Sequence, residues 1–293
     1  MIEQRIALAR FTTLGTGGPA HRFARPSTLG QLERALEWAA GRNLDVAVVG
    51  LGSNLLVADE GVDGLVVKLD GELAAVDARD GVLVAGGAAP NAVALHRARD
   101  AGLGGFEFAC AIPGTAGGGV KMNAGAYGSD WREIVQRALV VDAGGSRWLD
   151  GGELGLAYRR SGLDPGQVVA RVEFRLSPRP PDEIRATVAE FHARRKATQP
   201  TNRRTFGSVF KNPEHELSAG RMLEACGLKG FRVGGAMISP LHGNFIENAG
   251  GATSADAITL MAEARRRARE EYGVVLEHEV QLLGALELPP VGA

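Results

Sequence analysis

Residues 112–128 read IPGTAGGGVKMNAGAYG and hold six glycines in seventeen positions. Glycine loses more backbone entropy on folding than any other residue, so this density indicates backbone that must approach a neighbour closely. The segment is not a Walker phosphate loop, because Val120 rather than lysine follows Gly119. We expect its backbone to lie against a flat or phosphorylated ligand. The alternative is a crowded turn region without a ligand.

A second glycine-rich stretch, GLGSNL at residues 50–55, begins like the dinucleotide fingerprint G-x-G-x-x-G. Its sixth position is Leu55 and the following residues are strand-like, whereas a Rossmann loop leads into a helix. The stretch instead predicts a tight turn between strands, whose backbone N–H groups, Ser53 hydroxyl and Asn54 amide could surround a phosphate. Two such loops in one chain indicate a large cofactor with two parts.

The rest of the chain alternates between helix and strand patterns. Helices are predicted at 27–43, which opens with Thr28 and Gln31 in capping-box spacing, and at 91–105, 183–196, 218–227 and about 254–272. Strands are predicted at 81–87, 137–143 and 168–176, and on both sides of the Gly-Ser-Asn turn. The prolines of SPRPPD at 177–182 mark a boundary between segments. These patterns predict an α+β fold.

Composition excludes several classes of protein. The 293 residues include 33 basic and 34 acidic side chains, and a formal charge of −1 argues against general binding to nucleic acid or to a membrane surface. No stretch reaches the roughly 18 apolar residues of a membrane span. Cys110 and Cys226 lack metal-ligand spacing, so they are expected to be reduced core thiols. We expect a cytoplasmic protein.

The segment 194–213, RRKATQPTNRRTFGSVFKNP, carries six cationic side chains and no acidic one. Cations and amides that converge in this way suit the oxygen atoms of a phosphorylated ligand. The alternative is a solvated basic face. Ser208 within it is not a hydrolase nucleophile, because the elbow G-x-S-x-G would need glycine where Phe206 and Phe210 stand.

Eight motifs in order resemble one family over nearly the whole chain. They are FTTLGTGG (11–18), GLGSNLLV (50–57), IPGTAGGGVKMNAGAYG (112–128), YRRSGL (158–163), GSVFKNP (207–213), AGRMLEACGLKG (219–230), GGAMISPLHGNFIEN (234–248) and LEHEVQLLG (276–284). The family is that of the UDP-N-acetylenolpyruvoylglucosamine reductases, FAD enzymes of peptidoglycan precursor synthesis. No tyrosine lies between the YRRSGL and GSVFKNP motifs, so the chain resembles the shorter subclass, which lacks a tyrosine-bearing insert.

The resemblance implies an α+β architecture with an FAD-binding domain of the vanillyl-alcohol-oxidase type. Its two subdomains would be residues 1–66 and 67–182, followed by a substrate-binding domain at 183–293. A C-terminal strand at about 275–293 would pack back on the first subdomain. The implied ligands are noncovalent FAD, NADPH as co-substrate and UDP-N-acetylglucosamine-enolpyruvate as substrate. The implied protein is a cytoplasmic monomer.

The resemblance also assigns roles to residues. The implied catalytic residues are Ser208, Arg159 and Glu279. Those implied to hold FAD are Gly50, Gly52, Ser53, Asn54, Leu55, Pro113, Gly114, Thr115, Gly117, Gly118, Asn123, Gly125, Ala126 and Tyr127. Those implied to hold the substrate or NADPH are Tyr158, Lys196, Lys211, Asn212, His242 and Asn244.

The implied reaction moves a hydride from NADPH to FAD and then to C3 of the enolpyruvyl group, and Ser208 protonates C2. One alternative is another flavoenzyme on the same scaffold, an oxidase or dehydrogenase of small alcohols. Such enzymes frequently tether flavin through histidine, but every histidine here lies outside both glycine loops. A second alternative is a catalytically silent module that binds nucleotide sugars, and turnover of NADPH distinguishes it.

Overall fold

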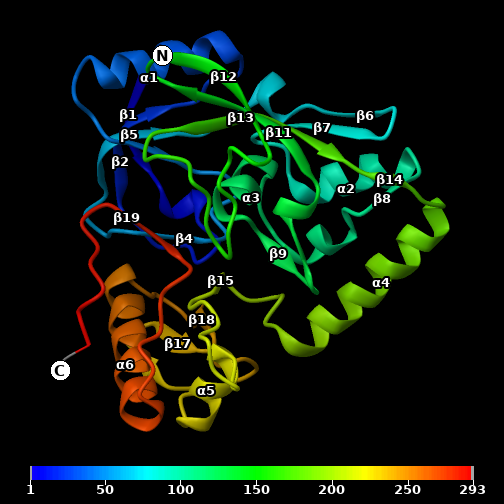
Figure 1. Ribbon diagram of the computed structural model, residues 1–293. Helices are drawn as coiled ribbons and strands as arrows, with labels where there is room; N and C mark the ends of the chain where they lie inside the picture. Colours follow the sequence, from blue (N-terminus) through cyan, green and yellow to red (C-terminus); the bar gives the residue numbers. More distant parts are fainter. Residues whose placement is uncertain (1, 292–293) are drawn as a thin grey trace. The chain divides into compact units, whose positions relative to one another are not determined.

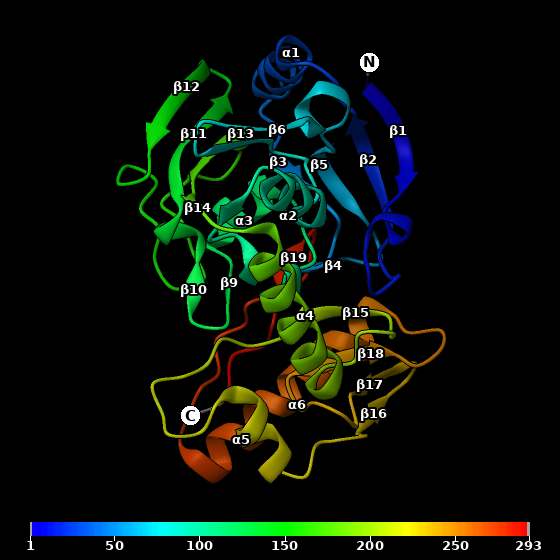
Figure 2. The ribbon, with the colours of Figure 1, turned by 90° about the vertical axis from the view of Figure 1, so that its right-hand side faces the viewer.

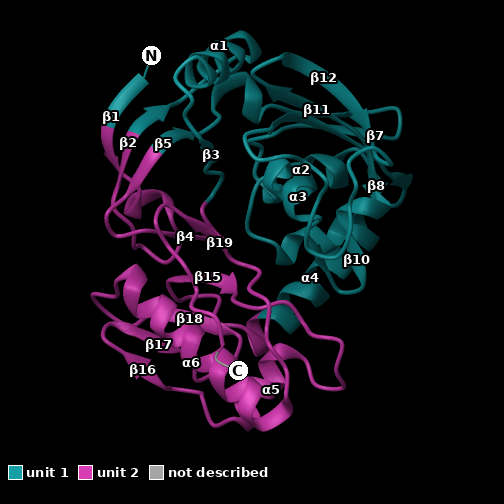
Figure 3. Ribbon diagram, turned by 60° about the vertical axis from the view of Figure 1, so that its left-hand side comes forward, with its two compact units in different colours: residues 1–4, 22–51, 64–195 teal, residues 5–21, 52–63, 196–293 magenta. Residues whose placement is uncertain are grey.

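The computed structural model describes residues 2–291, and the chain forms two compact units. Unit 1 runs up to residue 4 and over residues 22–51 and 64–195, and unit 2 contains residues 5–21, 52–63 and 196 onward. Figure 3 shows the chain changing unit within several strands. Each unit is therefore discontinuous in sequence. The ranges 1–66, 67–182 and 183–293 stay a prediction about domains.

Unit 1 is built on an antiparallel sheet in the order β12-β11-β13-β7-β6. The strands are β6 (Val76–Arg79), β7 (Val82–Gly86), β11 (Val135–Asp142), β12 (Gly145–Asp150) and β13 (Val168–Arg175). β-Branched residues favour such a pleated, half-buried surface. Along β13, Val169 belongs to one hydrophobic cluster and Val168 and Ala170 to another. The sheet therefore buries both of its faces.

The helices of unit 1 cover these faces. They are α1 (Leu29–Ala40), α2 (Asn91–Asp100), α3 (Ala116–Met122) and α4 (Pro181–Thr198, mostly in this unit). Leu32 and Leu36 of α1 pack with the cluster of Val168, while α2 and α3 lie together against the other face (Figure 2). The predicted cap is confirmed, because the Thr28 hydroxyl accepts a hydrogen bond from the Gln31 N–H.

A second sheet has the order β1-β2-β5-β3, and three of its strands cross the division between the units. These strands are β1 (Ile2–Ala7), β2 (Pro19–Ala24), β3 (Val46–Val48) and β5 (Val62–Val67). Short pairs complete unit 1: β8 (Leu103–Gly104) with β14 (Ser177–Pro178), and β9 (Gly125–Ala126) with β10 (Ser129–Asp130).

Unit 2 contains a sheet in the order β15-β18-β17-β16 and two helices (Figure 1). Its elements are β4 (Leu55–Val57), β15 (Thr205–Ser208), α5 (Ala219–Ala225), β16 (Arg232–Val233), β17 (Ala236–Ile238), β18 (Phe245–Asn248), α6 (Ser254–Tyr272) and β19 (Gln281–Leu283). Leu223, Leu260 and Ile246 belong to its buried core. β19 pairs in parallel with β4, so the last strand lies beside a strand from the first quarter of the chain. Within residues 2–291, no helix combines the length and apolar character that crossing a bilayer requires.

Candidate active site

The glycine-rich segment 112–128 contains α3, a short helix that the sequence analysis did not predict. Thr115 is its N-cap, and the Thr115 hydroxyl accepts a hydrogen bond of 3.3 Å from the Gly118 N–H. Gly119 is a packing position, because a Cβ there would clash with the Trp131 ring. Gly118 is exposed, and a Cβ there would meet only the Thr115 hydroxyl within 4 Å. The open face of this segment therefore lies at Gly118.

The other glycine-rich stretch reaches α3 through Gly50. A Cβ at Gly50 would lie 2.9 Å from the Thr115 hydroxyl oxygen, closer than real Cβ atoms come, so the approach requires glycine. The Gly50 carbonyl accepts a hydrogen bond of 2.6 Å from the Lys68 ammonium, and burial lowers the pKa of Lys68. The sequence reasoning missed Lys68. Its signal was a single lysine that follows the apolar strand β5.

Arg159 is carried by a tight turn in unit 1. Ala157 and Arg160 exchange backbone hydrogen bonds of 3.0 and 3.1 Å, which close a turn around Tyr158 and Arg159. Arg159 has φ 55°, a left-handed conformation, and its Nη2 donates a hydrogen bond of 2.8 Å to the Gly125 carbonyl. Its guanidinium lies 5.1 Å from the centre of the half-exposed Tyr158 ring. The turn thus brings Arg159 to the end of the glycine-rich segment.

The remaining predicted cofactor residues of unit 1 lie in α3 or in the segments directly before and after it. Asn123 ends the helix with its side chain fully buried, and Gly125 and Ala126 form β9. Tyr127 stacks on Phe191 of α4 at 4.3 Å between ring centres, and its hydroxyl donates a hydrogen bond of 2.9 Å to the Phe191 carbonyl. Before the helix, Pro113 is exposed and the Gly114 carbonyl accepts a hydrogen bond from the Asn91 N–H. Within the helix, Gly117 is buried.

Ser208 ends β15 in unit 2, next to a bulge. The register between β15 and β18 shifts between Thr205 and Ser208, and Gly207 within the shift has φ 82°. A Cβ at Gly207 would lie 3.3 Å from the Ser53 carbonyl oxygen. Ser53 of the 50–55 stretch and the residue before Ser208 are therefore neighbours within unit 2. Gly52 of that loop requires glycine, because a Cβ there would overlap the Phe11 carbonyl.

Glu279 lies on the segment next to Ser208. The Glu279 N–H donates a hydrogen bond of 2.8 Å to the carbonyl of Val209, the residue after Ser208. The Asn54 amide donates a hydrogen bond of 3.3 Å to the Glu279 carbonyl, and the Asn54 carbonyl accepts one of 3.0 Å from Gln281. Unit 2 thus brings together Ser208, Glu279 and the Ser53–Asn54 turn, and Leu55 opens β4 directly after it.

Asn244 supports the Ser208 segment from the other side. It is buried, its Oδ1 accepts a hydrogen bond of 2.9 Å from the Phe210 N–H, and its Nδ2 donates one of 2.8 Å to the Phe210 carbonyl. His242 accepts a hydrogen bond from the Asn244 N–H at Nδ1, and burial lowers the pKa of His242. Both residues were predicted to hold the substrate, and the structure gives Asn244 contacts that fix the backbone after Ser208.

The other predicted ligand residues lie around the same unit. The Lys211 ammonium pairs with the Glu277 carboxylate, and the Asn212 side chain accepts a hydrogen bond of 3.1 Å from the Ala219 N–H at the start of α5. Lys196 is exposed in the last turn of α4, at the point where the chain enters unit 2. The predicted residues therefore form two groups, one within unit 1 and one within unit 2.

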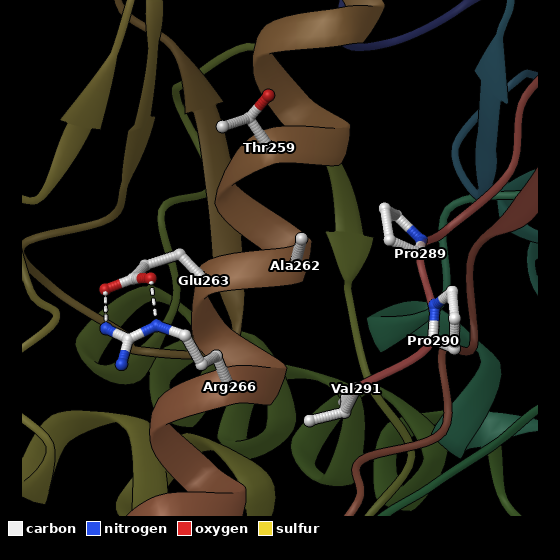
Figure 4. Close-up of a pocket in the computed structure, with 7 residues that line it drawn as sticks. All are labelled: Thr259, Ala262, Glu263, Arg266, Pro289, Pro290 and Val291. Atoms are coloured by element: carbon white, nitrogen blue, oxygen red, sulfur yellow. Dashed lines mark hydrogen bonds and ion pairs between the residues drawn. The ribbon is translucent and has the colours of Figure 1, made fainter. Parts of the chain in front are cut away.

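A shallow pocket in unit 2 lies away from these residues. It is lined by Thr259, Ala262, Glu263 and Arg266 of α6 and by Pro289, Pro290 and Val291 of the C-terminal segment (Figure 4). Its charged groups are already paired, because Glu263 and Arg266 point toward one another with a shortest N–O distance of 2.7 Å. None of the predicted site residues lines it, so we do not assign the active site there.

Comparison with known proteins gives concordant results. A family model described as an FAD binding domain matches residues 20–149, and the model of the UDP-N-acetylenolpyruvoylglucosamine reductase C-terminal domain matches residues 199–283. The reductase of Anaeromyxobacter dehalogenans is 44% identical over 97% of this chain and 85% of its own length. That of Rubrobacter xylanophilus is 42% identical over 94% of this chain and 93% of its own.

A crystal structure of the UDP-N-acetylenolpyruvylglucosamine reductase from Thermus caldophilus matches with a TM-score of 0.85 and 40% identity, over 97% of this chain and 99% of that one. An FAD-binding domain before this C-terminal domain defines an FAD-dependent oxidoreductase, and the expected α+β fold is confirmed. More narrowly, the chain belongs to the UDP-N-acetylenolpyruvoylglucosamine reductase family.

The residues present fit an FAD cofactor. Gly118 leaves an open face without a side chain, and at Gly50 the loop comes as close to Thr115 as a missing Cβ allows. Lys68 adds a cation at Gly50, which suits a diphosphate. In unit 2 the Ser53–Asn54 turn lies beside Ser208 and Glu279. The individual roles of these residues stay predictions.

Proposed function

We propose that the chain reduces the enolpyruvyl double bond of UDP-N-acetylglucosamine-enolpyruvate with NADPH, which yields UDP-N-acetylmuramate for peptidoglycan precursor synthesis. The observation that carries the proposal is that Ser208 and Glu279 lie on adjacent segments of unit 2. The Glu279 N–H donates a hydrogen bond to the carbonyl of Val209, the residue after Ser208, and the Ser53–Asn54 turn lies beside both segments. The names of the relatives support the choice of substrate.

The backbone around Gly50, Thr115 and Gly118 and the Ser53–Asn54 turn would hold FAD, and FAD would supply the hydride chemistry between NADPH and C3 of the enolpyruvyl group. The electron pair of the double bond then belongs to C2, next to the substrate carboxylate. Arg159 is proposed to bind that carboxylate, since a guanidinium fork pairs with two carboxylate oxygens. Charge on the carboxylate grows in the transition state, so Arg159 stabilises that state more than the ground state.

Ser208 is proposed to deliver the proton to C2. A hydroxyl is a weak acid, but a carbanion next to a carboxylate is a strong base, so a positioned serine can act as general acid. The backbone directly after Ser208 is held by Glu279 at Val209 and by Asn244 at Phe210. Lys211 or a water returns a proton to Ser208. The sum of the steps consumes substrate, NADPH and one proton and gives product and NADP⁺.

Isotope labelling of the product tests this reaction. NADPH deuterated at its transferable position should place deuterium at C3, and unlabelled NADPH in D₂O should place it at C2. Nuclear magnetic resonance of purified UDP-N-acetylmuramate distinguishes the two carbons. NADPH consumption that does not depend on the enolpyruvyl substrate would instead favour another flavoenzyme, and absence of NADPH consumption would favour a binding module.

A further inference from the structure

Three of the predicted site residues in unit 1 share an uncommon backbone conformation. Asn123, Tyr127 and Arg159 have φ values of 39°, 54° and 55°. Non-glycine residues seldom adopt this left-handed region, and among them asparagine adopts it most readily. Asn123 occupies the C-cap of α3, where a left-handed residue is usual. Its conformation therefore suits its place, whereas that of Arg159 needs support from other contacts.

The Asn123 amide is engaged on three sides inside the protein. Nδ2 donates hydrogen bonds of 3.0 Å to the Ala157 carbonyl and 3.1 Å to the Asp130 carboxylate. Oδ1 accepts a hydrogen bond of 2.9 Å from the Arg132 N–H. Because the side chain is fully buried, loss of these bonds would leave polar groups without water to replace them.

Ala157 is the residue on which the Arg159 turn closes. It exchanges hydrogen bonds of 3.0 and 3.1 Å with Arg160, and only Tyr158 and Arg159 lie between them. The turn has two further ties to the same part of unit 1. Arg159 Nη2 donates a hydrogen bond of 2.8 Å to the Gly125 carbonyl. The Ser161 hydroxyl donates one of 2.8 Å to the Lys121 carbonyl of α3. Asn123 thus links the end of α3 to the base of the turn.

We infer that Asn123 is a positioning residue for Arg159. Its amide fixes the Ala157 carbonyl, which holds the left-handed turn and so the direction of the guanidinium. This inference rests on the proposed function, in which Arg159 binds the substrate carboxylate. A displacement of about 1 Å at such a group can cost on the order of 100-fold in rate. Loss of the amide should therefore slow the substrate-dependent step.

Asn123→Gly tests the inference, because glycine accepts the left-handed backbone while the side chain that carries the amide is lost. We expect the rate at which enolpyruvyl substrate restores the flavin absorbance to fall about 10- to 100-fold per bound flavin. The rate at which NADPH removes that absorbance should stay within about twofold, since Arg159 has no part in that step. Flavin content and melting temperature measure the structural cost separately.

Asn43→Gly is the matched control. Asn43 also has a left-handed φ, 51°, but it is exposed in the turn after α1. The same substitution there should leave both steps unchanged. If Asn123→Gly does not fold, Ser161→Ala removes another tie of the same turn, and it should slow only the substrate-dependent step, by a few fold.

The double variant Asn123→Gly/Arg159→Ala separates this inference from the proposed function. If Asn123 acts through Arg159, its loss should have little further effect once Arg159 is alanine. Equal slowing of both steps in Asn123→Gly, or a normal rate per bound flavin, would make Asn123 merely structural and overturn the inference alone. A normal substrate-dependent rate in Arg159→Ala would overturn the proposed role of Arg159, and this inference with it.

Discussion

Arg159 shows how a functional side chain can depend on an unfavourable backbone. The second central position of its turn has φ 55°, where glycine is usual and other residues pay about 1 kcal/mol or more. Such strain persists only where neighbouring contacts fix it, and it gathers at functional sites. The motif YRRSGL supports the role of Arg159 through a family resemblance. The strained turn could not be predicted from that motif, because arginine is not a residue expected at positive φ.

Arg159→Gly and Arg159→Ala should therefore differ in stability and agree in activity. Both remove the guanidinium, so turnover should fall about 100-fold or more in each. Alanine keeps the strain of the left-handed turn and glycine does not, so the glycine variant should be the more stable by about 1 kcal/mol. Urea denaturation and steady-state turnover measure the two effects. Equal stability of the two variants would show that the turn relaxes when the guanidinium is lost.

Ser208→Ala should separate the two halves of the reaction. NADPH-dependent loss of flavin absorbance needs no proton at substrate C2, so its rate should stay nearly normal. Restoration of the absorbance by enolpyruvyl substrate should slow by roughly 10²–10⁴-fold, the size of a general-acid contribution. Stopped-flow absorbance follows both steps on one sample.

A serine that is not among the predicted site residues serves as the control for Ser208→Ala. The Ser218 hydroxyl is the N-cap of α5 and accepts a hydrogen bond from the Arg221 N–H. Ser218→Ala should cost about 0.5–2 kcal/mol of stability and leave both rates intact. If Ser208→Ala instead slowed the NADPH-dependent step and spared the other, Ser208 would not be the proton donor.

At the scale of elements, helices with explicit end signals were predictable. The range 254–272 matches α6, because Thr253 and Asp256 form a capping box and Gly273 ends the helix in a left-handed conformation. The helix predicted to start at Asn91 has Pro90 as its N-cap. α3 was missed because its consecutive glycines have low helix propensity. Tertiary packing, such as that of Gly119 against Trp131, stabilises this helix instead.

The charged stretch of α6 at residues 263–271 contains one strong group of ion pairs. Glu263 accepts hydrogen bonds of 2.7 Å from both Arg266 and Arg267. The hydrogen bond from Arg266 is the main cause that holds the pKa of Glu263 at about 2, well below its ordinary value of 4.5. Glu263→Gln should therefore lower the free energy of unfolding at neutral pH by about 1 kcal/mol, the upper range for exposed pairs.

The pH dependence of that difference has a defined direction. A depressed carboxyl pKa stabilises the folded state in full above the unfolded value, near 4.5, and the contribution disappears as the pH falls toward about 2. Urea denaturation of the wild type and Glu263→Gln should give curves that converge over this window. Glu270→Gln is the control on the same helix, since Glu270 is largely exposed and pairs with Arg266. A difference that persisted at the acid end would assign the effect to packing instead.

At the scale of the whole molecule, two features could not be predicted from the order of residues in the sequence. They are the grouping of distant segments into one unit and the ion pairs between distant residues. The family resemblance implied an FAD-binding domain before a C-terminal domain, which the family models confirm. Residues 5–21 and 52–63 nevertheless group with the C-terminal part of the chain, through pairings such as β4 with β19. Two cations of residues 194–213 also pair with acidic residues, which a count of charges within that segment could not reveal. Arg203 pairs with Glu247 and Lys211 with Glu277, both far away in sequence.

The hypothesis that the cationic segment binds phosphates must take these ion pairs into account, because Arg203 and Lys211 already have acidic partners. Both NADPH and the UDP-sugar carry phosphates, and a chain with a net charge of −1 must attract them locally. If they use one pocket in turn, the kinetics should be ping-pong, with inhibition by excess of either substrate. Lys196 is exposed near the end of α4, at the entry into unit 2, so it is the cation of this segment best suited to a test.

Lys196→Ala should raise the KM of one or both substrates about 10-fold, the equivalent of about 1.4 kcal/mol from a charged hydrogen bond, with kcat little changed. Added salt should raise the wild-type KM and narrow the gap between the two proteins, because ions screen an exposed charge. Arg185→Ala is the control, since Arg185 lies on the same helix, pairs with Asp182 and stands in unit 1. Its KM values should match the wild type. If Lys196→Ala matched as well, the segment would be a solvated basic face, and the phosphates would have to bind elsewhere, with Lys68 beside Gly50 as the next residue to replace.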